Sequence, residues 1–280
     1  MSNCQYLALP GMGKPMKMPV EPEDGRVTSL WMDGKVVNNC IFAEAAWFKK
    51  PFRETGLFKH DSDKLLIFVG SDPQDHENLN AEVEIWLEND KITLTQTSVV
   101  FVPAGVAHGR MEVKNLKKPV IHFTILMNSS YYNPIPAEAT APKGTYDRNW
   151  VEKYDPVDGF RPEAPEGFLT LLLWLDDKKL KGAPYLETVW FHTKNDTGPE
   201  EHCHDDFDEL IGFLGSDPEH PEDLGAEVKF YLGGEWVTIN KSGIFYIPRG
   251  VSHSPILVPK LERPIIHFSC GNGGDYAKKS

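Results

Sequence analysis

The sequence predicts an all-β chain built from two similar halves, and three observations support this prediction. Short runs rich in aromatic and β-branched residues are bounded by Gly, Pro and Asp, as in residues 226–232, 243–247 and 264–268. Apolar and mostly charged residues alternate over residues 82–87, which is the pattern of a half-buried strand. No segment shows a long apolar repeat of 3.6 residues, and many short motifs occur twice.

The repeated motifs indicate a tandem duplication. Leu-Trp-Met-Asp at residues 30–33 returns as Leu-Trp-Leu-Asp at residues 173–176, a separation of 143. Farther along, Gly-Ser-Asp-Pro at residues 70–73 returns at residues 215–218, a separation of 145. The later copy has therefore gained two residues between these points. The period is far too long for a solenoid, so each copy is predicted to be a domain.

The later copy carries a concentration of metal-ligating side chains. Residues 198–209 read Gly-Pro-Glu-Glu-His-Cys-His-Asp-Asp-Phe-Asp-Glu. His202 and His204 are two apart, so on a β-strand both project from one face and Cys203 projects from the other. Glu209 lies an odd step beyond His204, so we expect a turn before the strand that Glu209 begins.

Together with His253, in the sequence Pro-Arg-Gly-Val-Ser-His, these residues supply three imidazoles and one carboxylate. This donor set suits a single Mn(II), Fe(II), Ni(II), Co(II) or Zn(II) ion, and an octahedral ion would keep about two positions open to water or substrate. Open positions indicate reactivity and not a purely structural role.

These residues resemble the two motifs of the cupin superfamily, HxH followed after three or four residues by Glu, and PxGxxH. The resemblance implies that His202, His204, Glu209 and His253 bind one divalent transition metal ion per chain. It also implies two tandem jelly-roll barrels, an arrangement called a bicupin, in which the two-sheet design limits exposed strand edges. Residues 242–243 read Ser-Gly where the family usually has Gly-Asp. This difference affects a turn and leaves the ligand set intact.

The earlier copy lacks this ligand set. A shift of 145 places the four ligand positions on Leu57, Lys59, Lys64 and His108. A gap placed differently aligns His60 with His204 instead, but Lys64 still faces Glu209. A lysine ammonium adds positive charge where a carboxylate would neutralise it, so we predict a degenerate barrel without metal. That barrel would hold shape, mediate subunit contacts, or bind an anion through Lys59 and Lys64, unless the two lysines are simply solvated.

The predicted organisation has four parts. An N-terminal arm spans residues 1–29, the degenerate barrel residues 30–127, a proline-rich connector residues 128–167 and the metal-binding barrel residues 168–280. Proline punctuates the connector, so we expect it to run over the surface. The irregular, proline-containing stretch 9–19 suggests an arm that packs on a neighbour, and we expect a homo-oligomer.

Composition narrows the classes of partner. The formal charge of −12 and the pI near 5.3 argue against nucleic acid and anionic membrane surfaces. No apolar run approaches the roughly 20 residues of a membrane span, and no signal-like N-terminus is present. The four cysteines are scattered without CxxC spacing, which indicates reduced thiols and a cytoplasmic protein. The expected partner is a small-molecule substrate.

Two further histidines are candidate catalytic residues. His192 follows the predicted strand that leads into the first motif, and the earlier copy has Lys49 there, so His192 is either a general base or substrate contact, or a partly exposed strand-end residue. His267 recurs as His122, which favours a shared structural role, but His267 lines the cavity if it points inward. Glu201 and Asp208 either orient ligand imidazoles or face solvent. Cys203 is expected to pack.

The predicted function is that of a metal-dependent enzyme acting on a small oxygen-rich substrate that chelates the ion. The cupin resemblance makes a dioxygenase or another C–C bond-cleaving enzyme the favoured class. The alternatives are a non-oxidative isomerase, lyase or hydrolase that uses the metal as a Lewis acid, and a non-catalytic small-molecule binding protein.

Overall fold

The computed structural model describes residues 4–13, 25–274 and 276. The earlier repeat contains ten strands: β2 (Arg26–Met32), β3 (Phe42–Phe48), β4 (Phe52–Arg53), β5 (Leu57–Lys59), β6 (Lys64–Gly70), β7 (Asn78–Leu87), β8 (Asp90–Gln96), β9 (Ser98–Val102), β10 (His108–Lys114) and β11 (Val120–Leu126). The later repeat contains eight: β14 (Leu169–Leu175), β15 (Tyr185–Phe191), β16 (Glu209–Gly215), β17 (Asp223–Leu232), β18 (Glu235–Lys241), β19 (Gly243–Ile247), β20 (His253–Leu261) and β21 (Ile265–Gly271). Three short strands flank the repeats: β1 (Leu7–Ala8), β12 (Ile135–Pro136) and β13 (Trp150–Val151).

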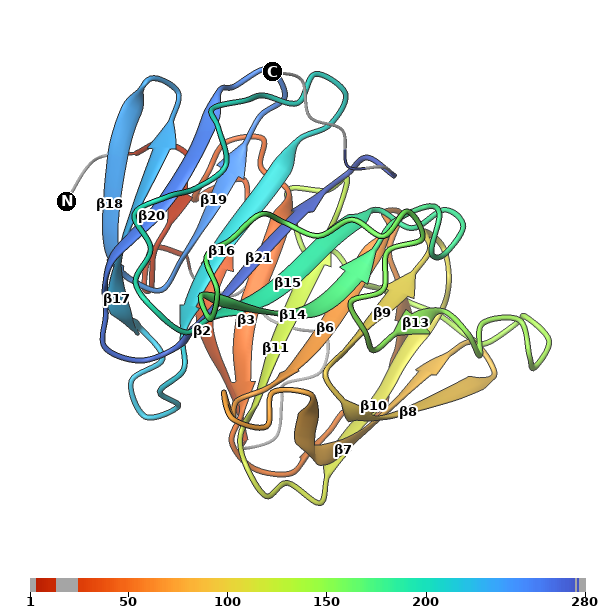
Figure 1. Ribbon diagram of the computed structural model, residues 1–280. Coiled ribbons are helices and arrows are strands. Elements are labelled where there is room, and N and C mark those ends of the chain that lie inside the picture. Colours follow the sequence, from red (N-terminus) through yellow and green to blue (C-terminus); the bar gives the residue numbers. More distant parts are fainter. Residues whose placement is uncertain (1–3, 14–24, 275, 277–280) are drawn as a thin grey trace.

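Each repeat folds into a barrel of two antiparallel sheets, an inner sheet that faces the other barrel and an outer sheet, and the two barrels lie side by side (Figure 1). In the first barrel both sheets have six strands: the inner sheet has the order β13-β9-β6-β11-β3-β2 and the outer sheet the order β12-β5-β10-β7-β8, with β4 paired to β10. In the second barrel the inner sheet has the order β1-β19-β16-β21-β15-β14 and the three-stranded outer sheet the order β18-β17-β20. The expected all-β fold of two jelly-roll barrels is confirmed. In the described part of the chain, no helix has the length and apolar character needed to cross a membrane.

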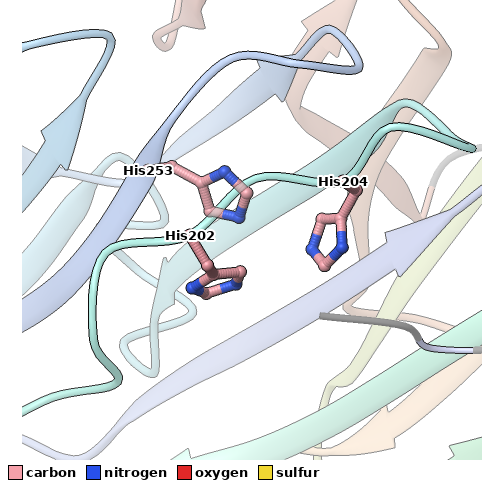
Figure 2. Close-up of side chains that lie close together, drawn as sticks. All are labelled: His202, His204 and His253. Carbon is pink, nitrogen blue, oxygen red and sulfur yellow. The ribbon is translucent and has the colours of Figure 1, made fainter. Parts of the chain in front are cut away.

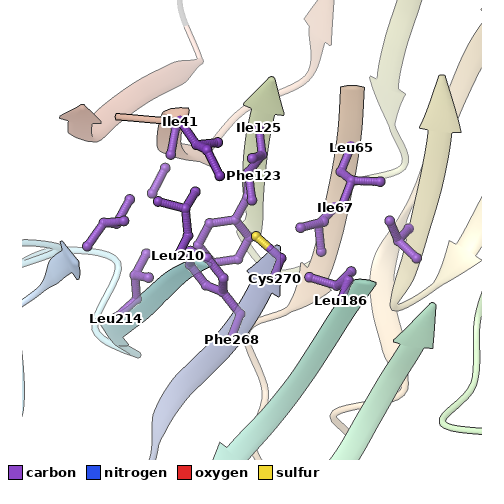
Figure 3. Close-up of a cluster of buried hydrophobic side chains, with 14 of the residues drawn as sticks. Ile41, Leu65, Ile67, Phe123, Ile125, Leu186, Leu210, Leu214, Phe268 and Cys270 are labelled. Atoms are coloured by element: carbon purple, nitrogen blue, oxygen red, sulfur yellow. The ribbon is translucent and has the colours of Figure 1, made fainter. Parts of the chain in front are cut away.

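The two inner sheets pack against each other through a shared apolar layer. Figure 3 shows side chains of both repeats in this layer, among them Phe123 of β11 and Phe268 of β21, whose ring centroids are 4.9 Å apart. The central strands of the inner sheets are therefore covered on both faces, and every residue of β3, β6, β11, β16 and β21 is buried. By contrast, β7 alternates between buried and partly exposed residues because its outer face meets solvent.

Each barrel receives one short strand from the segment that precedes the other repeat. Leu7 of β1 pairs with Phe245 of the second barrel, and Trp150 of β13 pairs with Val100 of the first barrel. Leu7 and Trp150 are 143 residues apart and their partners 145, so the two additions correspond in the duplication. The exchange ties each barrel to the other by backbone hydrogen bonds as well as by the shared layer.

The predicted N-terminal arm lies partly outside the described residues, which omit 14–24. Its described parts are residues 4–13, which pair with the second barrel of the same chain through β1, and residues 25–29, of which 26–29 belong to β2. Part of the connector, through β12 and β13, adds strands to the first barrel.

Candidate metal centre

The four predicted ligands come from two adjacent segments at one end of the second barrel. His253 opens β20 and Glu209 opens β16. His202 is joined to His253 by two backbone hydrogen bonds, from His202 N to His253 O at 3.0 Å and from His253 N to His202 O at 2.9 Å. The amide of Gly250 donates to the carbonyl of His204 at 2.7 Å, so the turn before His253 is fixed to the segment that carries the other two histidines.

The sequence predicted a regular strand for His202 and His204, but neither residue lies on one. His202 forms an isolated bridge, and the chain bends at Asp205 and Asp206 before β16 begins. This bend is the turn expected from the odd spacing to Glu209. The bridge to His253, and not a continuous ladder, sets the direction of the imidazoles.

The side chains nevertheless converge. Figure 2 shows the three imidazole rings of His202, His204 and His253 turned toward one another, and one ligand nitrogen from each lies within 4.8 Å of the others. Glu209 Oε2 lies 3.0 Å from His253 Nε2 and 3.5 Å from His204 Nε2. The structure thus brings together the four residues that the sequence selected.

Hydrogen bonds to the backbone present the ligand nitrogens of two of these rings. His202 Nδ1 lies 2.7 Å from the carbonyl of Glu200, and His253 Nδ1 lies 3.0 Å from the carbonyl of Val251. A carbonyl only accepts, so Nδ1 carries the proton and Nε2 is left with its lone pair toward the cluster. This is the arrangement that metal-binding histidines need.

Glu209 is ionised in this site. Burial raises the pKa of the Glu209 carboxyl, but hydrogen bonds and charge interactions with His204 and His253 outweigh that effect and lower its pKa to about 2. A buried carboxylate beside three imidazoles is a mixed oxygen and nitrogen donor set. The donor set therefore fits a divalent transition metal ion.

Aromatic side chains cover the cluster. The ring of His204 stacks on Phe207 at 4.3 Å between centroids, and Tyr276 lies 5.4 Å from His204. Tyr276 also packs on Tyr185, which contacts Trp174. These rings limit the access of water to the ligands.

Polar side chains continue from the cluster into the barrel. On β15, β16 and β21, every second residue faces the interior, so Tyr185, Glu187, Ser269 and His267 lie on the same side as Glu209. The hydroxyl groups of Tyr185 and Ser269 are 2.9 Å apart, and Tyr154 donates to Glu187 Oε1 at 2.7 Å.

His267 points inward and lines a pocket of about 90 Å³ with apolar neighbours such as Phe168 and Val189. Its ring stacks between Phe191 and Phe213, and its Nδ1 lies 3.1 Å from the carbonyl of Gly212. Burial lowers the pKa of His267 to about 4, so the ring is neutral near pH 7.

The structure does not bring His192 to the cluster. Its ring stacks on Trp190, which belongs to the shared apolar layer and not to the barrel interior. Thr170 Oγ1 lies 2.9 Å from His192 Nε2. Burial and the charge of His76, in the first barrel, lower the pKa of His192.

Asp208 and Glu201, which flank the ligands in the sequence, form hydrogen bonds to the turn that precedes His253. Asp208 accepts hydrogen bonds from the backbone and guanidinium of Arg249, and so holds the turn that precedes His253. Glu201 accepts from Ser252. Cys203 is partly exposed and lies near Asp205, outside the cluster.

Strand register shows which residues of the first barrel correspond to the cluster. Lys64 opens β6 as Glu209 opens β16, and the residues that pair with them are themselves 145 apart: Val102 and Leu126 for Lys64, Ile247 and Gly271 for Glu209. His108 pairs with Phe58 as His253 pairs with His202. His60, two residues beyond Phe58, therefore corresponds to His204. The two extra residues of the later copy are therefore not adjacent: one lies before His202 and the other lies between His204 and Glu209.

Lys64 occupies the centre of this second cluster. Its Nζ lies 3.0 Å from His108 Nε2 and 3.4 Å from His60 Nε2. Lys64 is only 4% exposed, so a solvated surface lysine is the wrong interpretation for it. Burial and the charge of Lys64 lower the pKa of His60 to about 3, and lower that of His108 as well, so both imidazoles are neutral acceptors.

Several groups around the two clusters could not be selected from sequence patterns. Tyr154, Tyr276, Arg26 and Glu54 lie outside the repeated motifs. Glu187 could have been selected from the sequence, because a glutamate recurs at the corresponding position, Glu44, within a mostly apolar strand of the earlier repeat.

Comparisons with known proteins agree with the fold. No protein-family model and no curated protein sequence matches the chain. The solved structure of the Lactobacillus farciminis oxalate decarboxylase formate complex matches with a TM-score of 0.62 at 11% identity, over 100% of this chain and 90% of that one. A mutant of Bacillus subtilis oxalate decarboxylase matches with a TM-score of 0.63 at 11% identity, over 100% of this chain and 80% of that one. The chain has the two-barrel fold of the cupin superfamily.

Proposed function

We propose that the second barrel binds one divalent transition metal ion through His202, His204, Glu209 and His253, and that it cleaves a C–C bond in a small, oxygen-rich substrate. The observation that carries this proposal is the convergence of three imidazole nitrogens within 4.8 Å beside a buried carboxylate. The expected stoichiometry is one ion per chain, because Lys64 takes the place of the carboxylate in the first barrel.

The residues around the site have distinct tasks in this proposal. The Nδ1–H groups of His202 and His253, donating to backbone carbonyls, hold the two rings in the orientation needed for binding. Glu209 supplies the negative charge. When bound, the ion polarises carbonyl or carboxylate oxygens of a chelating substrate and stabilises the negative charge that develops on them.

The interior polar groups would position the substrate. Tyr185 and Ser269 offer hydroxyl groups, and Glu187 with Tyr154 offers a hydrogen-bonded pair. We assign His267, whose neutral ring lines the pocket, a contact with substrate, while His192 has no role because its ring packs on Trp190 of the shared layer. The pocket that His267 and Glu187 line has a volume of about 90 Å³, and none of the four proposed metal ligands lines it.

The substrate class follows from the donor set and from the fold. Two open positions suit a ligand with two neighbouring oxygens, such as a hydroxy-keto acid, an enediol or a 1,3-dicarbonyl compound. The solved structures of the same fold are named as oxalate decarboxylases, which act on a small dicarboxylic acid. At 11% identity this likeness concerns the fold, so it supports the general class of C–C bond cleavage and leaves the particular acid to experiment.

Metal analysis is the first test. Protein purified without chelators should contain about one equivalent of a single transition metal. The His204→Ala variant should lose most of it, and the matched His108→Ala variant of the first barrel should retain it. Equal loss in both variants, or two equivalent ions per chain, would contradict the assignment.

Turnover is the second test. The metal-loaded protein is incubated with the substrate classes named above, with and without oxygen, and carbon-containing products are identified by mass spectrometry. Products shortened by C–C cleavage, absent in His204→Ala, support the proposal. Isomerised or hydrolysed products only, or no turnover by the fully loaded protein, would overturn it.

A further inference from the structure

The interior of the first barrel contains a second cavity with its own reactive groups. It has a volume of about 40 Å³. Its polar wall includes Arg26, Glu54, Lys64 and His108, and its opposite wall is apolar. Glu54 and Tyr132 on its wall are partly exposed.

The amine of Lys64 is presented to this cavity by two acceptors. His108 Nδ1 lies 3.0 Å from the carbonyl of Val106, and the ring nitrogen of His60 is likewise engaged by the backbone of Asn133. The Nε2 atoms of both rings are therefore acceptors for Lys64 Nζ. A neutral amine has two N–H bonds and one lone pair. The two imidazoles take both N–H bonds, which leaves the lone pair for a molecule in the cavity.

The carboxylate of the neighbouring strand is occupied elsewhere. Glu44 is bound by the guanidinium of Arg26 at 2.5 Å and by the hydroxyl of Thr28 at 2.6 Å. Burial lowers the pKa of Lys64 to about 8, against the opposing charges of Glu54 and Glu44 and with a small contribution from Arg26. A desolvated lysine of this kind is a far better nucleophile near neutral pH than an exposed one.

We propose that the cavity is a binding site for small aliphatic aldehydes, and that Lys64 forms an imine with them. Lys64 Nζ adds to the carbonyl carbon, the C–N bond forms as the C=O π bond breaks, and one amine proton passes through His108 to the oxygen to give a neutral carbinolamine. The C–O bond then breaks as the hydroxyl takes a proton from Glu54, water leaves, and the second amine proton returns to Glu54, so that the neutral imine remains. No oxidation or reduction occurs in this sequence.

Glu54 is placed to supply the proton for loss of water. Its side chain lines the same cavity as Lys64. Burial raises the pKa of the Glu54 carboxyl, while the charges of Lys64 and Arg26 oppose that rise. A carboxylic acid with a raised pKa is a suitable general acid near neutral pH.

The size of the cavity limits the aldehyde. One water needs about 10–15 Å³ of such space, so about 40 Å³ holds a carbonyl compound of roughly two to four heavy atoms. Acetaldehyde is the smallest probe with a carbon chain, and glycolaldehyde and glyoxal are of similar size.

The titratable groups that face Lys64 come from several elements. They are Arg26 of β2, Glu44 of β3, Glu54 and His60 of the following loops, His108 of β10, His122 of β11 and Tyr132 of the connector. Of these, His60, His108 and His122 have pKa values lowered by burial, and burial raises the pKa of Tyr132. The amine of Lys64 is therefore the group expected to titrate near pH 8.

Reductive trapping tests the proposal. The intact wild-type protein is incubated with acetaldehyde and cyanoborohydride, and ethylation of each lysine is measured by peptide mapping. Labelling of Lys64 should exceed that of Lys181, whose side chain is 90% exposed, by about tenfold or more at pH 7.5. The rate at Lys64 should level off above pH 8, while labelling of ordinary surface lysines continues to rise.

Variants separate the roles. Glu54→Gln should slow labelling of Lys64 several-fold and leave Lys181 unchanged, whereas Lys64→Arg should remove the selective adduct. His204→Ala should label as the wild type does, because the site is independent of the second barrel. Labelling of Lys64 no faster than that of Lys181, or with the same pH profile, would overturn the proposal, and this comparison within one wild-type sample does not depend on how any variant folds.

Discussion

Glu209 and Lys64 hold the same position in the two barrels, and the difference between them changes what each barrel contains. In the second barrel the carboxylate and a divalent ion together would carry a net charge of +1. In the first barrel the ammonium form of Lys64 carries +1 alone, with its Nζ donating to the imidazoles of His60 and His108. Replacement of the acid by lysine thus preserves the charge of the cluster and satisfies the imidazoles without an ion.

The second difference is the number of imidazoles in each cluster. Phe58 pairs with His108 where His202 pairs with His253, so the first barrel lacks one imidazole as well as the carboxylate. The aromatic cover is retained, since Tyr132 contacts His60 as Tyr276 contacts His204. The two barrels therefore keep the same architecture around clusters of opposite chemistry.

The largest expected effect is the conversion of the second cluster into the first. In Glu209→Lys, an ammonium group replaces the carboxylate among His204 and His253, so metal content should fall from about one equivalent to near zero. Elemental analysis after exposure to excess metal measures this. Glu209→Gln, which keeps the shape of the side chain, guards against a folding defect. Retention of a full equivalent by folded Glu209→Lys would contradict the role of Glu209.

The reverse conversion should create a site. Lys64→Glu restores a carboxylate beside His60 and His108, which gives three of the four donors. We expect a second ion, bound about 10–100-fold more weakly than the first because one ligand is missing. Adding Phe58→His should tighten it. Isothermal titration of the Glu209→Lys background, in which the second barrel is expected to bind no metal, isolates this binding, and absence of any binding when Lys64→Glu and Phe58→His are combined would contradict the correspondence of the two clusters.

The metal-binding motif and the duplication together allowed the metal ligands to be predicted from the sequence. His202, His204, Glu209 and His253 share spacing that fixes their proximity in this fold, so the four could be selected before their positions were known. The alignment of His60 with His204 could not be settled in the same way. It depends on a one-residue difference in the bend before β6 and β16, which becomes visible only in the strand pairing of Lys64 and Glu209.

Other features depend on contacts that no local pattern records. Phe123 and Phe268 form the layer between the barrels, and the sequence does not distinguish this layer from a barrel core, because a strand buried on both faces has the same apolar pattern on each side. The exchange of β1 and β13 cannot be predicted from the sequence either, because two-residue strands are too short to show a periodic pattern. The inward direction of His267 and the outward direction of His192 likewise follow from strand register.

The shared layer predicts that the two barrels unfold together. Phe123→Ala removes a fully buried ring that contacts Phe268 of the other barrel, so it should lower the free energy of unfolding by about 3–5 kcal/mol. Urea unfolding should remain a single transition, and hydrogen exchange should show loss of protection in both β6 and β16. Phe230→Ala, inside the second barrel, is the matched control for ring loss away from the layer. Two separate transitions in the wild type would show that the layer does not couple the barrels.

The smallest expected effect is the pH dependence that Lys64 gives to the first barrel. The pKa of Lys64 is about 8 in the folded chain, below its ordinary value of 10.5, because burial disfavours the ammonium. The unfolded chain therefore binds more protons between these values, and stability rises with pH in that interval, on the order of 3 kcal/mol in total. Below pH 8 both states are protonated and the contribution is constant. The measured quantity is the difference in free energy of unfolding between chains with Lys64 and with Lys64→Met, both carrying Glu209→Lys and both measured after chelation, so that no metal in the second barrel contributes. A difference that stays flat from pH 7 to pH 10 would show that the Lys64 amine is not held in a desolvated state, and would weaken the comparison between a barrel with an internal ammonium and one with a metal site.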